Sequence, residues 1–314
     1  MGYLGELTTL ITIGKFEFDF VTEVQIKSSW KKLTDTAQII LPRNLKWKDR
    51  YLRDEIKKGD AVTIQFGYDF NYVTEFIGYV TDLQNAVPVV IECEDAMWKL
   101  KQTNITKTFR SVTLRQLLSE ILPKGTVFET VDANLGPFRI NKVSAAKVLE
   151  ELRKQYGFVS FFRAGKLYVG FPYSIVKPQR HELTFEEDII KDQLNYKKKE
   201  DVKLMVRAVS MLPGGDSLEE EIGDKDGEVH SLHFYNLSRT QLKASATEES
   251  KRLRYEGWRG SFLTFGTPSI QHSDTLRLNS LEYPERRGDY LIDEVDIAFG
   301  TEGYRQEVTL GPSV

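Results

Sequence analysis

Three acidic residues that lie close together are the first candidates for chemistry in this chain. Glu92 and Glu94 are two positions apart in a segment whose apolar residues alternate, so a strand would place both carboxylates on one face and Asp95 on the other. Glycoside hydrolases use two carboxyl groups as acid and as base or nucleophile. No substrate groove is identifiable beside these residues. Surface or turn carboxylates are therefore the preferred interpretation, and a glycan or peptidoglycan hydrolase is one alternative.

Residues that could bind a metal are scattered. The acidic segment 224–228 lacks the spacing of an EF-hand. His230 and His233 are three apart on a predicted strand and point to opposite faces, while His181 and His272 are isolated. No phosphate-binding glycine loop, dinucleotide fingerprint, nucleophile elbow or zinc spacing appears. We therefore expect no catalytic residue, no cofactor and no cofactor-binding or metal-binding residue: the chain is predicted not to be an enzyme.

Four tryptophans could form a stacking platform for sugars or bases. Each lies near a predicted turn or the end of an element, which favours packing or subunit contact. A carbohydrate- or receptor-binding module of a tail particle remains a second alternative. The four are Trp30, Trp47, Trp98 and Trp258.

The single cysteine, Cys93, lies in an alternating apolar run, and no base is identifiable near it. One cysteine excludes an internal disulfide and indicates a reducing compartment.

Length and charge narrow the possible classes of protein further. The 314 residues suggest about two domains, and 40% hydrophobic residues support packed cores. With 43 basic and 46 acidic residues, the net charge of -3 gives no footprint for sustained phosphate binding, which disfavours an OB-like nucleic-acid binder. No segment approaches the roughly 20 apolar residues of a membrane span, so no integral membrane segment is expected.

The elements that must position these residues are mostly strands. Apolar residues alternate with period two through the first 100 residues, between Gly, Pro, Asn and Asp, which is typical of antiparallel β structure in a barrel or sandwich. The predicted strands are 8–20, 21–26, 36–41, 61–66, 76–80 and 87–93.

The period changes near residue 100. Thr113 and Gln116 have the spacing of a capping box, and Ser144 precedes a helical pattern over 145–156 that Gly157 ends. A hairpin is predicted next, with strands at 158–162 and 167–171. The region is therefore a small α+β unit.

From residue 181 the sequence is again β-rich, with strands at 202–209 and 229–235. The intervening polar segment at about 213–228 is predicted as a hairpin tip or loop. Ser238 opens a second capping box, which predicts a helix at about 238–256.

The two β-rich parts show the same order of elements. The runs 59–64, 76–82 and 88–93 match 273–278, 290–296 and 304–310. The predicted fold class is mainly β with an α+β insert: two related β-barrel-type domains at 1–100 and 179–314 flank a small α+β domain at 101–178.

Several runs resemble the phage tail hub family. This family includes the baseplate hub of contractile-tailed phages, the late control protein of temperate phages and the hub portion of type VI secretion spikes. The resemblance follows the order of the domains over most of the chain, although its motifs are degenerate. The resembling runs are 28–42, 59–64, 76–80, 92–100, 289–295 and 304–311.

The resemblance implies a structural virion component of a contractile injection system. Both β-barrels would be tube domains, and a homotrimer would place six of them in a pseudo-hexameric ring that joins a six-fold tail tube to a three-fold spike. The implied partners are the tail tube and spike proteins, with baseplate wedge or tape-measure proteins as further candidates and DNA only as passing cargo. The implied location is a virion tail or injection particle assembled in the bacterial cytoplasm.

Overall fold

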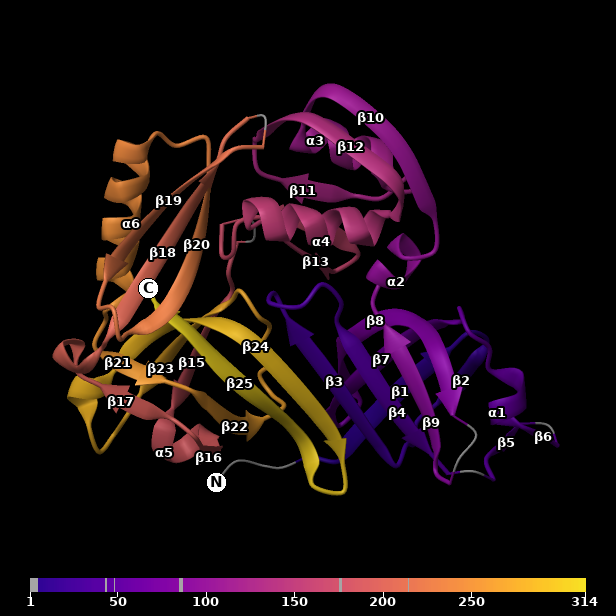
Figure 1. The fold of residues 1–314 in the computed structure, drawn as a ribbon. Helices are drawn as coiled ribbons and strands as arrows, with labels where there is room; N and C mark the ends of the chain where they lie inside the picture. The colour runs from indigo at the N-terminus through magenta and orange to yellow at the C-terminus, as the bar shows by residue number, and fades with distance from the viewer. Residues whose placement is uncertain (1–4, 43, 48, 85–86, 175–176, 214) are drawn as a thin grey trace.

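The computed structural model describes residues 5–314 except 43, 48, 85–86, 175–176 and 214. The fold is mainly β (Figure 1). The two β-rich parts lie side by side and share one 13-stranded sheet, and the α+β unit lies against them. None of the helices in the described ranges has the length and apolar character needed to cross a bilayer.

The first barrel is antiparallel throughout, in the order β3-β4-β9-β8-β7-β1-β2. Its inward positions are the alternating apolar residues of the sequence, such as Ile11, Ile39 and Ile64, all fully buried. A short excursion between β4 and β7 contains β5 (Lys46–Trp47), β6 (Arg50–Tyr51) and α1 (Leu52–Glu55). The main strands are β1 (Leu7–Ile13), β2 (Phe16–Phe18), β3 (Glu23–Ser29), β4 (Thr36–Leu41), β7 (Ala61–Tyr68), β8 (Asn71–Gln84) and β9 (Val89–Glu94).

The second barrel has the order β15-β23-β24-β25-β22-β16. Short helical turns at Lys199–Asp201 and Pro284–Arg286 lie between its strands. Its elements are β15 (Arg180–Thr184), α5 (Phe185–Asp188), β16 (Ile189–Asp192), β17 (Asn195–Lys197), β21 (Gly257–Arg259), β22 (Ser261–Phe265), β23 (Thr275–Asn279), β24 (Gly288–Gly300) and β25 (Gly303–Ser313).

The two barrels repeat one strand order. The six strands compared are β1, β3, β4, β7, β8 and β9 in the first barrel and β15, β16, β22, β23, β24 and β25 in the second. When each set is numbered from one to six along the chain, both barrels place the strands in the spatial order one, four, five, six, three, two. The first pairing differs in direction, because β1 is antiparallel to β7 whereas β15 is parallel to β23. The internal repeat is therefore present in the structure.

Hydrogen bonds fix the register of this repeat. Val80 donates its N–H to the carbonyl of Asp60 at 2.9 Å, and Ile292 donates to Asp274 at 3.0 Å. Both strands then bulge by one residue, at Thr81 and Asp293. Val80 is thus equivalent to Ile292, so 76–82 matches 288–294. The comparison of the sequences alone placed this run two residues too late, because it followed the aromatic residues.

The α+β unit has the predicted helices. Thr113 and Gln116 form the capping box of α3, Ser144 accepts a hydrogen bond from Lys147 N at the start of α4, and Gly157 ends α4 in the left-handed conformation. The elements are α2 (Met97–Leu100), β10 (Asn104–Thr113), α3 (Leu114–Ile121), β11 (Phe128–Thr130), β12 (Asn134–Ser144), α4 (Ala145–Tyr156), β13 (Val159–Arg163) and β14 (Lys166–Gly170).

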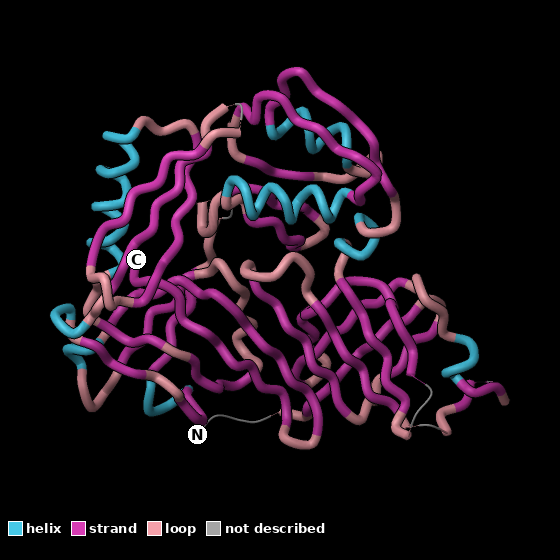
Figure 2. The backbone as a smooth tube through the Cα atoms, in the orientation of Figure 1, coloured by secondary structure: helices cyan, strands magenta, loops and turns pink. Residues whose placement is uncertain are grey.

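The polar segment at about 213–228 was predicted as a loop, and this prediction is wrong for residues 217–223. They form β19 (Ser217–Gly223), which pairs with β18 (Leu204–Met211), and β18 also pairs with β20 (Glu228–Tyr235). Leu218 and Ile222 pack against a small core that α6 (Arg239–Leu253) covers (Figure 2). The acidic run Glu219, Glu220 and Glu221 hid this period-two pattern. The predicted capping box at Ser238 is present, and the helix ends three residues before 256.

Candidate functional site at the contacts between the units

The first contact is the seam between the two barrels. Residues 294–299 of β24 pair antiparallel with residues 24–29 of β3, which makes one sheet out of two barrels. Lys27 lies opposite Asp296, and Ile26 lies opposite Ile297. The seam therefore combines backbone hydrogen bonds with one charged and two apolar cross-strand pairs, the second being Val24 with Phe299.

Aromatic rings complete the seam. Phe66 of the first barrel stacks on Phe299 of the second, with ring centroids 4.4 Å apart, and meets the edge of Tyr304 at 5.3 Å. The Tyr304 hydroxyl donates to Glu75 Oε1 at 2.5 Å. Burial raises the pKa of Glu75, so this carboxyl group takes up a proton more readily than an exposed glutamate does.

The second contact centres on Asp274, which is 1% exposed. Its carboxylate accepts hydrogen bonds from the backbone N–H groups of Gln179 (3.1 Å) and Gln271 (3.3 Å). It also lies 3.1 Å from His181 Nε2 and 3.4 Å from Arg163 Nη1. Arg163 is the last residue of β13, so one carboxylate ties the α+β unit to the second barrel.

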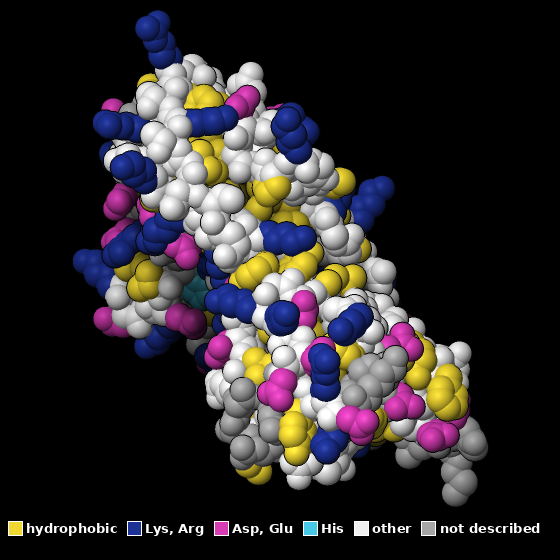
Figure 3. All heavy atoms as spheres, turned by 90° about the vertical axis from the view of Figure 1, so that its right-hand side faces the viewer, with side chains coloured by type: hydrophobic (Ala, Val, Ile, Leu, Met, Phe, Trp, Pro, Cys, Tyr) yellow, Lys and Arg dark blue, Asp and Glu magenta, His cyan; other side chains and the backbone are white. Residues whose placement is uncertain are grey.

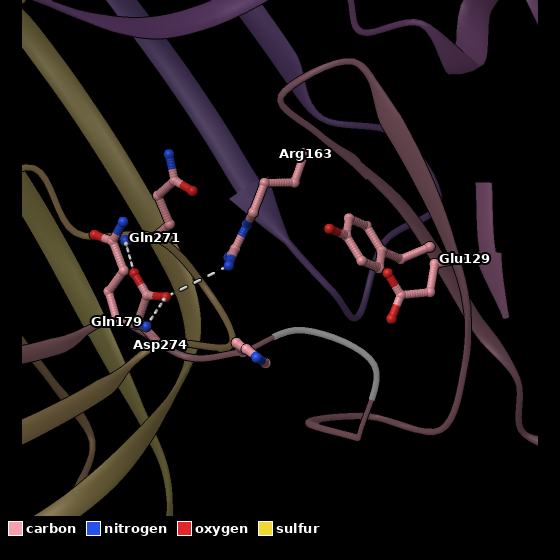
Figure 4. A pocket seen from close by; sticks show the side chains of 7 residues that line it. Glu129, Arg163, Gln179, Gln271 and Asp274 are labelled. Carbon is pink, nitrogen blue, oxygen red and sulfur yellow. Dashed lines mark hydrogen bonds and ion pairs between the residues drawn. The ribbon is translucent and has the colours of Figure 1, made fainter. Parts of the chain in front are cut away.

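A cavity of about 370 Å³ opens beside this carboxylate (Figure 4). Asp274 and Arg163 point toward each other, and Glu129 lies on the side of the α+β unit. Among the described residues, no serine, threonine or cysteine lines the cavity, so a hydroxyl or thiol nucleophile of the catalytic-triad kind is not seen beside His181 and Asp274. The arrangement is that of a structural ion-pair network. The lining residues are Glu129, Arg163, Tyr168, Lys177, Gln179, Gln271 and Asp274.

The third contact centres on Asp293, the bulged residue of β24. Trp30 Nε1 donates to its Oδ1 at 3.1 Å, the Tyr173 hydroxyl donates to the same oxygen, and Lys31 Nζ lies 2.6 Å from Oδ2. Burial, followed by the negative charge of Asp293, raises the pKa of the Tyr173 hydroxyl, so it remains a donor. Asp293 thus joins the first barrel, the second barrel and the linker after β14.

These anchoring aspartates were not singled out from the sequence. A signal existed, because the repeat aligns Asp60 with Asp274. Asp60 Oδ2 accepts from Lys57 N at 2.8 Å, three residues earlier, as Asp274 Oδ2 accepts from Gln271 N. The turn is thus common to both barrels. In the second barrel, its aspartate also binds Arg163 of the α+β unit.

Two further carboxyl groups, of half-buried Asp35 and buried Asp95, lie where the first barrel meets the α+β unit. Burial raises the pKa of Asp35 to about 6, although the Ser28 hydroxyl donates to it at 2.6 Å and the Ser29 N–H at 3.1 Å. Burial also raises the pKa of Asp95 well above its usual range, and the nearby Asp35 charge adds to this. Both groups therefore take up a proton at a higher pH than an exposed aspartate does.

We expect the Asp35→Asn variant to be more stable than the parent above pH 7. A folded pKa raised to about 6 means that the stability contributed by Asp35 is present at low pH and lost as the pH rises through 6. Asparagine keeps an acceptor for Ser29 and a donor for Ser28 without the charge. Urea denaturation should give a gain of about 1–2 kcal/mol at pH 7.5 and a flatter slope of stability between about pH 4 and 6. Asp216→Asn is the control and should leave the stability unchanged. An Asp35→Asn variant less stable than the parent at pH 7.5 would contradict this prediction.

The acidic residues considered for hydrolysis each bind a neighbouring group. Glu92 accepts from Gln38 Nε2 at 2.9 Å, and Glu94 pairs with Lys101 at 2.7 Å. Asp95 is 5% exposed and accepts from Met97 N at 2.9 Å. None of these three carboxylates lines the 370 Å³ cavity. Their geometry supports local structural roles.

The histidines and the acidic segment 224–228 are also dispersed. Within the described ranges, no group of three His, Cys, Asp or Glu residues could hold a metal ion. Asp224 instead accepts from Arg254 Nη2 at 2.8 Å, and His230 Nε2 lies 3.5 Å from Glu228. His272 is buried beneath Phe161, and burial lowers its pKa to about 3, so it is neutral.

The tryptophans whose side chains are described pack within the chain. Trp98 stacks on Tyr79 at 5.6 Å, and Trp258 stacks on Phe185 at 5.7 Å. Trp30 lies in the Asp293 contact, whereas the side chain of Trp47 lies outside the described residues. Cys93 is buried, and burial raises the pKa of its thiol, so a reactive thiolate is disfavoured.

Comparisons with known proteins give a consistent result at the level of structure. No family model and no curated protein matches the sequence. The tail protein from Neisseria meningitidis MC58 is 14% identical, with a TM-score of 0.64 over 97% of this chain and 96% of that chain. The 43 kDa tail protein of prophage MuSo2 from Shewanella oneidensis is 14% identical, with a TM-score of 0.62 over 97% of each chain.

A component of the Escherichia coli type VI secretion system is also similar. It is 11% identical, with a TM-score of 0.63 over 96% of this chain and 76% of that chain, and is itself described as similar to the T4 bacteriophage tail proteins gp27 and gp5. The expected resemblance to tail hub proteins is thus confirmed in the structure. The chain has the fold of phage tail proteins and of this hub-like type VI secretion component.

Proposed function

We propose that the protein is a structural tail hub, three copies of which form a pseudo-hexameric ring between a tail tube and a central spike. The observation that carries this proposal is the repeated strand order of two barrels within one continuous sheet. Three chains with two similar barrels each supply six similar units, which suits a ring that faces a six-fold tube on one side and a three-fold spike on the other.

The contacts between the units suit a structural role. The Asp274 and Asp293 contacts fix the α+β unit and both barrels against one another through buried, charge-assisted hydrogen bonds. We propose that such contacts hold the units of one subunit in a fixed arrangement. The three-domain division at 1–100, 101–178 and 179–314 is part of this proposal, with the β18–β20 sheet and α6 as an addition to the second barrel.

Charge on the surface fits DNA as passing cargo. Basic and acidic side chains are mixed with apolar ones on the face in Figure 3, and the whole chain has a net charge of -3. A mixed surface gives no sustained attraction for phosphates, so DNA would cross the ring without binding tightly. We further propose a non-enzymatic role in the virion tail or injection particle, with the tail tube and spike proteins as partners.

The test is the assembly state of the purified full chain. We expect light scattering at increasing concentration to approach three times the monomer mass, and electron microscopy to show a three-fold ring with an open channel. A strict monomer at high concentration, or a closed particle without a channel, would contradict the proposal.

A further inference from the structure

One edge of the first barrel is left unpaired at the end of β8. The pairing of β7 with β8 ends where Ala61 faces Tyr79, whereas β9 continues along the other side of β8 to Gln84. Residues 82–84 therefore present one backbone edge that no strand pairs with in the described part of the chain. Unpaired edges are templates for another strand.

The equivalent edge of the second barrel is occupied. The pairing of β23 with β24 ends where Thr275 faces Leu291, and β3 then takes over this edge from Glu294 to Phe299. Because Val80 is equivalent to Ile292, residues 82–84 of β8 correspond to 294–296 of β24. The barrel seam thus shows which strand fits at such an edge: the second strand of a neighbouring barrel.

The second strand of the second barrel is also open on one side. In the first barrel, Cys93 faces Val80 on one side and Ala37 on the other. In the second barrel, Leu310 faces Ile292, the equivalent of Val80, so Leu310 is equivalent to Cys93. On its other side, Leu310 donates its N–H to the carbonyl of Gly260. Ala37 is therefore equivalent to Gly260.

This equivalence fixes the neighbouring strand as well. One residue earlier, Thr36 is equivalent to Arg259. Thr36 faces Lys27, and Arg259 faces Asn195, so Lys27 is equivalent to Asn195. β16 and β17 together thus match β3. Their other edge has no strand partner in the ranges the structure describes.

We propose that the β8 edge of one copy pairs antiparallel with the β16–β17 edge of the next copy, in the geometry of the seam inside the chain. This inference rests on the proposed ring and specifies its subunit contact. Transferring the register of the seam places Asp82 opposite Lys197, Leu83 opposite Tyr196 and Gln84 opposite Asn195.

The chemistry of the two edges is complementary in this register. Asp82 and Lys197 carry opposite charges, and the Asp82 side chain is exposed while that of Lys197 is half-buried. Leu83 and Tyr196 are half-buried apolar partners. The contact joins two different surfaces, so it links copies head to tail, and the proposed ring requires that it close after three copies.

Cysteine cross-linking tests this register in the full chain. We expect Asp82→Cys combined with Lys197→Cys to give covalent dimers and trimers on mild oxidation, since directly opposite strand residues lie within disulfide reach. Each single variant should stay uncross-linked, and a mixture of the two should stop at dimers. The natural Cys93 is buried and serves as the silent background. Asp82→Cys with Lys154→Cys on the exposed side of α4 is the matched control.

Charge reversal provides a second measurement if the disulfide geometry is unfavourable. Asp82→Lys should lower the trimer fraction in light scattering at low salt by several-fold, and adding Lys197→Asp should restore it. A trimer with neither cross-linking nor rescue would overturn this register and leave the ring intact. A monomer in every assay would refute the ring and the contact together. Cross-linking of Asp82→Cys alone would indicate an edge that pairs with itself and would overturn the head-to-tail contact.

Discussion

Replacing Asp274 with alanine is expected to lower the free energy of unfolding by about 3–5 kcal/mol. The substitution leaves the Arg163 guanidinium without its carboxylate and removes the acceptor for two backbone N–H groups and His181. A buried cation without a counter-charge costs more than the ion pair itself contributes, which is why the loss is large. Urea denaturation followed by tryptophan fluorescence measures it.

Two variants show whether charge or shape carries this effect. Asp274→Asn keeps one acceptor oxygen and should lose less, on the order of 1–3 kcal/mol. Asp216→Ala removes an exposed aspartate and should change stability by less than about 0.5 kcal/mol. If Asp274→Ala matched Asp216→Ala, the carboxylate would not hold the α+β unit.

Replacing Phe66 with alanine is expected to cost about 3–5 kcal/mol as well, because the ring is fully buried and lies between the barrels. Truncation leaves a cavity against Phe299 and Tyr304 at the point where the barrels meet. We expect the urea midpoint to fall. We also expect limited proteolysis to separate the two barrels into fragments, because the variant weakens the seam before the rest of the fold.

The controls separate seam loss from general loss of apolar surface. Phe66→Leu fills part of the cavity and should give a smaller decrease. Phe70→Ala removes a ring that is 67% exposed, so its effect should stay within about 0.5 kcal/mol. A loss for Phe70→Ala equal to that for Phe66→Ala would argue against a special role of the seam.

The parts of the fold that depend on neighbouring residues could be predicted from the sequence. Thr113, Ser144 and Ser238 cap helices through bonds to residues three positions later, and Gly157 ends α4 by its own left-handed conformation. The alternation of apolar residues likewise placed the strands of the first barrel. β19 was missed because its acidic residues outweighed the alternation of Leu218 and Ile222.

The contacts between units could not be predicted in this way. Arg163 and Asp274 are 111 residues apart, and Trp30 and Asp293 are 263 apart. Neither partner carries a local pattern that names the other, because each contact depends on how complete units dock. The expected absence of catalytic residues followed from missing motifs, and it remains a prediction.

The seam also has a consequence for synthesis on the ribosome. β3 emerges early, but its partner residues 294–299 emerge only after some 270 further residues have been translated. Until then one edge of the first barrel is open to foreign strands, and such late, long-range pairing is slow. Nascent chains are therefore most exposed to misassembly and chaperone capture during this interval, and a stall before residue 294 should yield a barrel that aggregates through β3.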